Sequence, residues 1–185
     1  MASDFEITIT QTIPTSVFKG HDAGVTAILP LPTPNRSGAL GDLLLTGSYD
    51  DHVRVYTTYD GRQNAPSTAG KALAQLKIGG GVWRLKFLDT PEQMSAGREG
   101  VKFKVLASCM HAGARILEVK MDTSQEGGWS IEILGSVTVH DSMCYGCDVQ
   151  PSPDSNDDMN KERLCVSTSF YDRLVCVWKF DPNAV

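Results

Sequence analysis

The chain has 185 residues, 41% hydrophobic and 21% charged, which is the balance of a folded globular domain and excludes wholesale disorder. The formal net charge of -5 gives no electrostatic reason to expect nucleic acid or an anionic membrane as a partner. No uncharged apolar run approaches the roughly 18 residues of a membrane span, and residues 1–18 lack the basic and then apolar order of a signal peptide. We therefore expect a soluble, cytoplasmic protein without membrane or nucleic-acid partners.

A repeated unit runs along the chain. Residues 47–56, 108–117 and 169–178 align with one another, and their last residues are 61 positions apart in both intervals. Each segment has a strand end of small residues, a tight polar turn and an alternating strand that closes on a large apolar residue. Self-similarity at a fixed period is typical of repeat architectures.

Further strands complete each unit. A short strand is expected before each repeat, at residues 25–29, 82–87 and 144–149, and another follows at 72–78 and 129–139. Four short strands, here called a, b, c and d in chain order, make one propeller blade. No helical period is present, so the pattern predicts an all-β fold.

The strand pattern predicts that residues 1–185 form part of a β-propeller, and with Gly20-His21, Asp50, His140 and Asp172 its units resemble WD repeats. The first blade is expected at about 20–78, the second at 79–139 and the third at 140–181, with 1–19 as the outer strand of a preceding or closing blade. Three blades cannot close a ring, and an open end exposes a blade interface. We therefore expect the C-terminal part of a larger, seven-bladed propeller, whose missing N-terminal blades close the ring.

The five cysteines predict reduced thiols, because their number is odd and no secretory signal is present. Cys144 and Cys147 form a C-x-x-C pair, a spacing found in zinc sites. The flanking pattern is that of a strand, in which a separation of three puts the two thiols on opposite faces. No second pair completes a ligand set, so no metal site is expected.

His21 with Asp50, and His140 with Asp172, occupy the positions of a structural pair. In WD repeats a histidine before strand a hydrogen-bonds an aspartate in the b–c turn, since a buried carboxylate needs donors. Each pair could also be read as catalytic. The scaffold reading is favoured for both, more strongly in the first blade.

The second blade departs from this pattern twice. Ile78 stands where the histidine belongs and is followed by three glycines, residues 79–81, while His111 replaces the turn aspartate. Glycines let backbone N–H groups approach a ligand closely. His111 has no evident scaffold partner, although a flexible turn with an exposed histidine is an alternative.

Several motifs resemble the WD-repeat diphthine methylesterases, over roughly residues 18–180. They are Gly79-Gly80-Gly81-Val82-Trp83-Arg84, Cys109-Met110-His111-x-Gly113, His140-x-Ser142-x-x-Tyr145-Gly146-x-Asp148, Ser169-Phe170-Tyr171-Asp172 and, in the preceding blade, residues 45–51. Arg173 departs from the family, which has histidine there, and the N-terminal blades are missing.

The resemblance implies an esterase of diphthamide biosynthesis. Such an enzyme hydrolyses the methyl ester of methylated diphthine on translation elongation factor 2, its protein substrate, and releases methanol and diphthine. The resemblance implies no metal or organic cofactor.

Ester hydrolysis needs a base, an attacking group and donors for the developing oxyanion. His111 is the first candidate for the general base of an attacking water, and Ser142 and Cys144 are possible nucleophiles, since no G-x-S-x-G elbow is present. The other catalytic candidates are expected on the same face, where the d–a and b–c connections emerge together: His140, Tyr145, Tyr171 and Asp172. The substrate-binding candidates are Gly79, Gly80, Gly81, Trp83 and Arg84.

Two alternatives remain at this point. Most WD-repeat proteins are interaction platforms, so the second blade's departures could mark a peptide-binding groove with Trp83 and Tyr145 as anchors. The chain could also be an inactive fragment of the esterase.

Overall fold

The computed structural model describes six stretches of the chain: residues 20–32, 43–57, 72–88, 101–122, 128–151 and 162–181. This described part contains eleven β-strands and no helix, and so no helix that could cross a membrane. The predicted outer strand within residues 1–19 lies outside the described residues.

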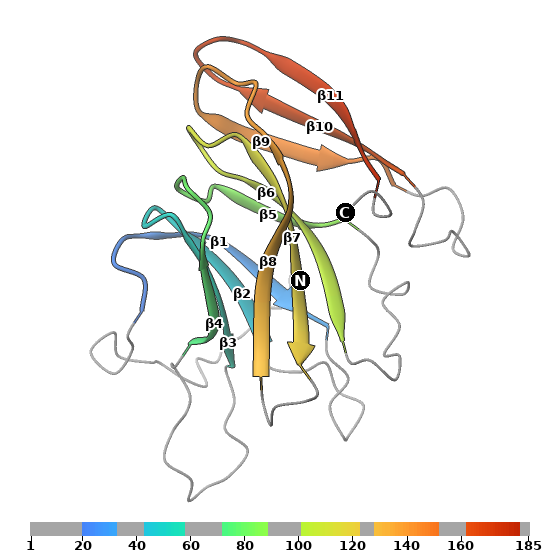
Figure 1. Ribbon diagram of the computed structural model, residues 1–185. Helices are drawn as coiled ribbons and strands as arrows, with labels where there is room; N and C mark the ends of the chain where they lie inside the picture. The colour runs from blue at the N-terminus through green and yellow to red at the C-terminus, as the bar shows by residue number, and fades with distance from the viewer. Residues whose placement is uncertain are drawn as a thin grey trace, which may run out of the picture.

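The strands form three antiparallel sheets that follow one another along the chain (Figure 1). The first sheet has the order β1 (Val25–Leu31), β2 (Leu43–Ser48), β3 (His52–Thr57), β4 (Ala72–Lys77). The second has the order β5 (Arg84–Phe87), β6 (Lys102–Ser108), β7 (Ala114–Asp122), β8 (Gly128–Val137). The third has three strands, β9 (Cys144–Val149), β10 (Arg163–Ser169) and β11 (Val175–Phe180).

The predicted all-β, blade-type fold is confirmed. Each sheet is a meander whose strands lie within one of the predicted ranges 20–78, 79–139 and 140–181. The strands form because β-branched and aliphatic residues alternate with polar ones between turn residues.

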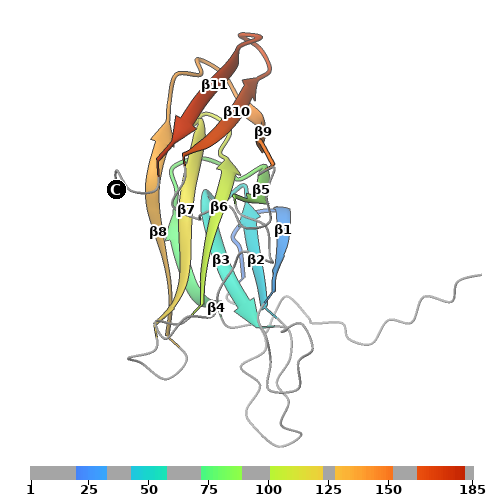
Figure 2. The same ribbon diagram turned by 90° about the vertical axis from the view of Figure 1, so that its right-hand side faces the viewer.

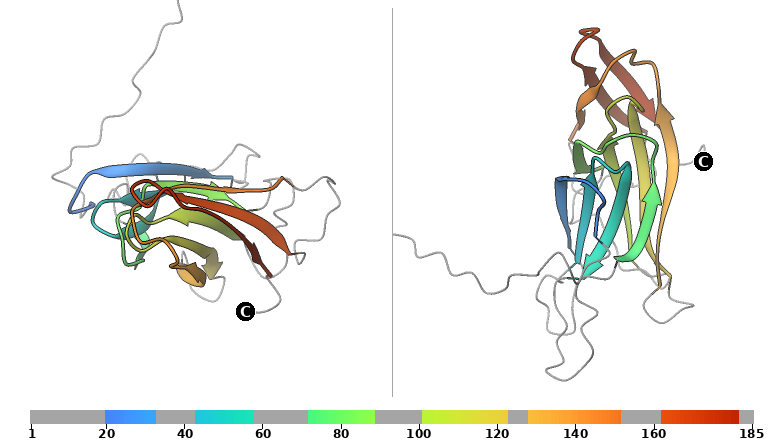
Figure 3. Two further views of the ribbon diagram at one scale, coloured as in Figure 1. Left: turned by 90° about the horizontal axis from the view of Figure 1, so that it is seen from above. Right: turned by 90° about the vertical axis from the view of Figure 1, so that its left-hand side faces the viewer.

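Apolar side chains between the sheets hold the three blades together. One buried cluster, with Val53, Val82 and Phe103 among its members, joins the first and second sheets. A second cluster, with Ile116, Cys144 and Cys165 among its members, joins the second and third. The sheets therefore stack face to face, and the views in Figure 2 and Figure 3 show them fanned out in chain order.

The prediction that Cys144 and Cys147 lie on opposite faces of a strand is wrong. Both side chains are buried in the cluster between the second and third sheets. The cause is an irregularity in the pairing of β9 with β10, where Ser169 pairs with Cys144 but Thr168 pairs with Gly146. The extra residue, Tyr145, shifts the alternation by one position, as a β-bulge does.

The b–c turn of the third blade is one residue longer than the turns before it. The last strand pairs flanking the turn are Gly47 with Val53 in the first blade and Thr168 with Val175 in the third. Ser167, which pairs with Cys176, is therefore the structural equivalent of Thr46, which pairs with Arg54. The gap-free sequence alignment places Thr168 there instead.

Candidate active site

The connections expected to carry the site gather at one edge of the three sheets. In the first blade the N–H of Tyr49 donates to the carbonyl of Gly24 at 3.1 Å. The turn of the second blade reaches the third, since the N–H of Cys144 donates to the carbonyl of Met110 at 2.9 Å. In the third blade the N–H of Phe170 donates to the carbonyl of Met143 at 3.2 Å. Each b–c turn thus lies against the start of a strand a.

The first blade contains the predicted structural pair, set in a larger polar network. The Nδ1 atom of His21 lies 3.0 Å from Asp50 Oδ1, and its Nε2 atom lies 2.8 Å from the hydroxyl of Thr46. Arg54 donates to the same carboxylate at 2.7 Å. Only 6% of the Arg54 and Asp50 side chains is exposed, so the network is a buried, fully paired scaffold.

The protonation of this network follows from its contacts. Burial alone raises the pKa of Asp50, but the hydrogen bonds from His21, Arg54 and the backbone N–H groups of Asp22 and His52 outweigh it and hold the pKa well below its usual range. Burial lowers the pKa of His21, against the opposing effect of Asp50. The ring of His21 is thus held between the Asp50 carboxylate and the Arg54 guanidinium at Nδ1 and the Thr46 hydroxyl at Nε2.

The third blade keeps its histidine, but the contact with Asp172 is indirect. Both ring nitrogens of the buried His140 bind serine hydroxyls, Nδ1 at 2.8 Å from Ser169 and Nε2 at 2.7 Å from Ser167. The indole N–H of Trp178 donates to Ser167 at 3.1 Å, and Ser169 hydrogen-bonds Asp172. Because the turn has one extra residue, Ser169 connects His140 to Asp172, an arrangement we call the Ser169 relay. Both nitrogens of His140 are thus bound within the fold.

In the second blade, apolar side chains replace the polar network. Ile78 and Ala107, which occupy the positions of His21 and Thr46, are both buried in the cluster between the first two sheets. Backbone hydrogen bonds hold the turn instead, including Cys109 N–H to the Gly113 carbonyl at 2.7 Å. The guanidinium of Arg115 also donates to the Ala112 carbonyl at 2.6 Å. This turn therefore needs no side chain from residue 111.

The glycine triplet packs closely against two turns. A Cβ on Gly80 would lie 2.3 Å from the carbonyl oxygen of Cys109, and one on Gly81 would lie 2.6 Å from Met110 Sδ and 3.3 Å from Tyr49. Gly79 has a φ of 90° and is exposed, whereas Gly80 and Gly81 are buried. Close packing explains the last two glycines, and Gly79 is the exposed residue of the three. Their role as oxyanion donors stays a prediction.

His111 differs in its surroundings from His21 and His140, the histidines that precede strand a in the first and third blades. Its side chain is exposed, and within the described residues its imidazole makes no hydrogen bond or ion pair, unlike those of His21 and His140. The carbonyl of its neighbour Met110 accepts a hydrogen bond from the Cys144 N–H, and the glycine triplet packs against the same turn. The packing of this turn therefore leaves the His111 imidazole exposed to solvent.

Aromatic side chains form a continuous row across this edge of the molecule. Ring centroids are 6.0 Å apart for Tyr49 and Trp83, 4.9 Å for Trp83 and Tyr145, 6.2 Å for Tyr145 and Phe170, and 5.1 Å for Phe170 and Tyr171. We call these five residues the aromatic row. It brings together Trp83, Tyr145 and Tyr171 from the predicted site and adds two residues that the sequence reasoning missed. Their signal was the repeat itself, because Tyr49 aligns with Tyr171 and Trp83 with Tyr145.

The remaining candidates have distinct surroundings. Arg84 is exposed next to Asp148, whose carboxylate pairs with Lys86. The hydroxyl of Ser142 accepts the N–H of Tyr171 at 2.9 Å. Burial raises the pKa of the Cys144 thiol to about 11, which keeps it protonated at neutral pH. A buried thiol is a poor nucleophile, so Cys144 belongs to the core.

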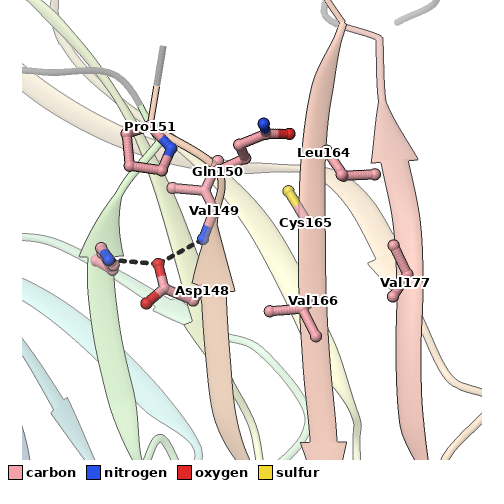
Figure 4. Close-up of a pocket in the computed structure, with 9 residues that line it drawn as sticks. Asp148, Val149, Gln150, Pro151, Leu164, Cys165, Val166 and Val177 are labelled. Carbon is pink, nitrogen blue, oxygen red and sulfur yellow. Dashed lines mark hydrogen bonds and ion pairs between the residues drawn. The ribbon is translucent and has the colours of Figure 1, made fainter. Parts of the chain in front are cut away.

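A hollow of about 480 Å³ lies elsewhere, at the Val149 end of β9 (Figure 4). It is lined mainly by apolar side chains of β9, β10 and β11, among them Val149, Leu164 and Val177, and contains none of the predicted site residues. In the described part of the chain, no group of three or more His, Cys, Asp or Glu side chains is arranged to hold a metal ion.

The repeat pattern and the four-stranded sheets define the class: the chain contains blades of a WD-repeat β-propeller. Residues 12–57 match the family model "WD domain, G-beta repeat". A solved β-propeller domain, Cps50 (Swd1) of Myceliophteria thermophila, aligns over 90% of this chain and 61% of its own at 10% identity, with a TM-score of 0.27. Because this TM-score is low, the fold assignment rests on the antiparallel sheets and on the match to the repeat model.

Among individual proteins, the chain is similar to relatives named diphthine methyltransferase. It is 32% identical to that of Schizosaccharomyces pombe over 86% of this chain and 38% of the relative. It is 32% identical to the Saccharomyces cerevisiae protein over 85% of this chain and 37% of the relative. It is 33% identical to the Homo sapiens protein over 70% of this chain and 23% of the relative. The chain thus spans less than two fifths of the length of these relatives.

Proposed function

We propose that the protein hydrolyses the methyl ester of methylated diphthine on translation elongation factor 2 and yields diphthine and methanol. The similarity to relatives named diphthine methyltransferase supports the pathway. The observation that carries the reaction type is His111, an exposed imidazole on a turn whose packing does not require it. Hydrolysis needs such a base and no methyl donor.

In the proposed mechanism, His111 removes a proton from a water molecule as its oxygen attacks the ester carbonyl carbon. The resulting tetrahedral oxyanion accepts hydrogen bonds from nearby donors, for which the Gly79 N–H and the hydroxyls of Tyr145 and Tyr171 are candidates. The C–O bond to the methoxy group then breaks. The protonated His111 returns its proton to the leaving methoxide, so one water is consumed and one methanol is released.

Methanol release separates hydrolysis from the methyl transfer in the relatives' name. The purified protein at its natural length is incubated with methylated elongation factor 2 and no methyl donor. Hydrolysis predicts methanol and a substrate that loses one CH₂ unit in mass. A requirement for a methyl donor, with a gain of the same unit, would overturn the proposal.

An interaction scaffold is the second candidate, and the exposed aromatic row is the observation in its favour. Mass spectrometry of elongation factor 2 from cells that lack the gene distinguishes the two. The esterase predicts that the methylated intermediate accumulates in these cells, whereas a scaffold leaves it absent.

A further inference from the structure

Arg115 is a half-buried cation that forms no ion pair with any carboxylate of the described residues. Its Nη1 atom donates to the backbone carbonyls of Ala112 and Ala114, at 2.6 and 3.1 Å. A guanidinium has five N–H donors, and both of these bonds use the same nitrogen. The Nε and Nη2 atoms, which form one edge of the guanidinium plane, therefore have no acceptor within the described part of the chain.

Arg54 occupies the equivalent position in the first blade, and its guanidinium is paired on two sides. Its Nη1 atom donates to the carboxylate of Asp50 at 2.7 Å, and its Nε atom donates to the side-chain oxygen of Gln75 at 3.2 Å. Gln75 lies opposite Arg54 on the neighbouring strand β4. A carboxylate and an amide thus satisfy this arginine, which is 5% exposed.

Both acceptors are replaced in the second blade, although the arginine is kept. His111 takes the place of the turn aspartate, four residues before Arg115. On β8, Ser136 lies opposite Arg115, where β4 of the first blade has glutamine. Among the described residues, neither of these side chains hydrogen-bonds the guanidinium. The second blade therefore has the cation of the network without its anion.

The backbone of the turn accounts for the new arrangement. In the first blade, Asp51 is the turn residue with a positive φ, of 64°, whereas in the second blade Met110 and Gly113 have positive φ values of 42° and 79°. The two turns thus differ in conformation although they have the same length. In the second, the carbonyl of Ala112 accepts the Nη1 bond that a carboxylate accepts in the first.

The unpaired edge of Arg115 lies at the candidate active site. A Cβ on Gly79 would lie 4.0 Å from Nη2, so the glycine places no side chain beside this nitrogen. The Ala112 carbonyl that holds Nη1 belongs to the residue that follows His111. The guanidinium therefore lies between the glycine triplet and the turn that carries the His111 imidazole.

The chemistry of this edge suits an anion with two oxygens. The parallel N–H groups of a guanidinium edge bind a carboxylate in a bidentate pair, and such charge-assisted bonds are stronger than neutral ones. An ester is uncharged, whereas its hydrolysis creates first an oxyanion and then a carboxylate. A cation at this place therefore favours the transition state over the substrate.

We propose that the Nε–Nη2 edge of Arg115 binds the carboxylate that ester hydrolysis creates and, before it, the tetrahedral oxyanion. This assignment rests on the hydrolysis proposed above. The two residues of the turn then have separate tasks, since His111 transfers the proton and Arg115 stabilises the negative charge. The carboxylate of the product takes the place that Asp50 fills beside Arg54 in the first blade.

Acetate is a probe that requires no turnover, and methyl acetate is its neutral counterpart. Each is titrated into the protein at its natural length, at constant ionic strength, and the arginine Nε–H signals are followed by NMR. The Arg115 signal is expected to shift with acetate and not with methyl acetate. The Arg54 signal is the internal control and is expected to shift with neither, because Gln75 and Asp50 hold it. An Arg115 signal that ignores acetate, or responds equally to methyl acetate, would overturn the proposal.

The variant Arg115→Gln removes the charge and keeps a donor for the turn. It is expected to weaken acetate binding about 10- to 100-fold. In methanol release it is expected to lower kcat about 10²- to 10³-fold, as the loss of an oxyanion donor does, with KM for the methylated substrate unchanged. Inhibition by elongation factor 2 that carries diphthine is expected to weaken as well, and Arg115→Lys to give intermediate values.

Lys102→Gln is the control, since it removes a positive charge at the other end of β6 from the turn. It is expected to keep the wild-type kcat and product inhibition, and the unfolding midpoint of each variant shows whether it is folded. A folded Arg115→Gln variant with unaltered kcat and product inhibition, in an otherwise active enzyme, would overturn the role of Arg115 alone. A wild-type protein that releases no methanol would instead overturn the proposed function, and with it the assignment of the carboxylate to the product.

Discussion

The first blade holds its b–c turn with a buried polar network, whereas the second blade holds the equivalent turn with apolar packing, glycine and backbone hydrogen bonds. In the first, His21, Asp50 and Arg54 are bound to one another and none is available for another task. In the second, Ile78 takes the histidine position and His111 faces solvent. Without the polar network, the turn of the second blade leaves the side chain at position 111 with no structural role.

The largest expected loss of stability comes from breaking the first blade's network. Asp50→Ala removes the acceptor of His21 and Arg54 and leaves the arginine charge buried without its partner. Breaking a buried pair in this way costs about 3 to 5 kcal/mol. Denaturant unfolding measures the loss. Asp172→Ala at the exposed turn of the third blade is the control. An equal loss of stability in that variant would contradict a special role for the buried network of the first blade.

The second blade is expected to be sensitive to added volume instead of lost charge. In Gly80→Ala the new methyl group would lie 2.3 Å from the Cys109 carbonyl oxygen and force the turn to move. A cost of about 1 to 3 kcal/mol is expected, as for other overpacked sites. Gly135→Ala is the matched control because its Cβ would meet nothing nearer than 3.7 Å. Equal stability of the two variants would show that the triplet is not closely packed.

A smaller effect is expected from pH. Burial lowers the pKa of His21 in the folded state, so the unfolded chain binds the proton first and stability falls as the pH drops through about 6.5. The slope stays below about 1.4 kcal/mol per pH unit, the limit for one proton. Urea unfolding between pH 7.5 and 5.5 measures it. His21→Asn is expected to lose this slope and His111→Ala to keep it; the reverse result would contradict the assignment.

The sheets and the His21–Asp50 pair could be predicted because each depends on a local pattern, strand alternation or a polar pair at repeat spacing. The bulge at Tyr145 could not be predicted, because one extra residue in a strand leaves no mark in composition. It brings the side chains of Cys144 and Cys147 into the same buried cluster instead of onto opposite faces. The Ser169 relay was missed for the same reason, since it depends on one added turn residue. The aromatic row depends on how separate blades stack, which one blade's sequence does not specify.

The most direct test of the central claim is methanol release by His111→Ala in the protein at its natural length, measured beside its unfolding midpoint. We predict a fall of about 10² to 10⁴ in rate, the usual contribution of a general base, with the midpoint unchanged because the turn is held without this side chain. Unchanged methanol release in a folded variant would contradict the account.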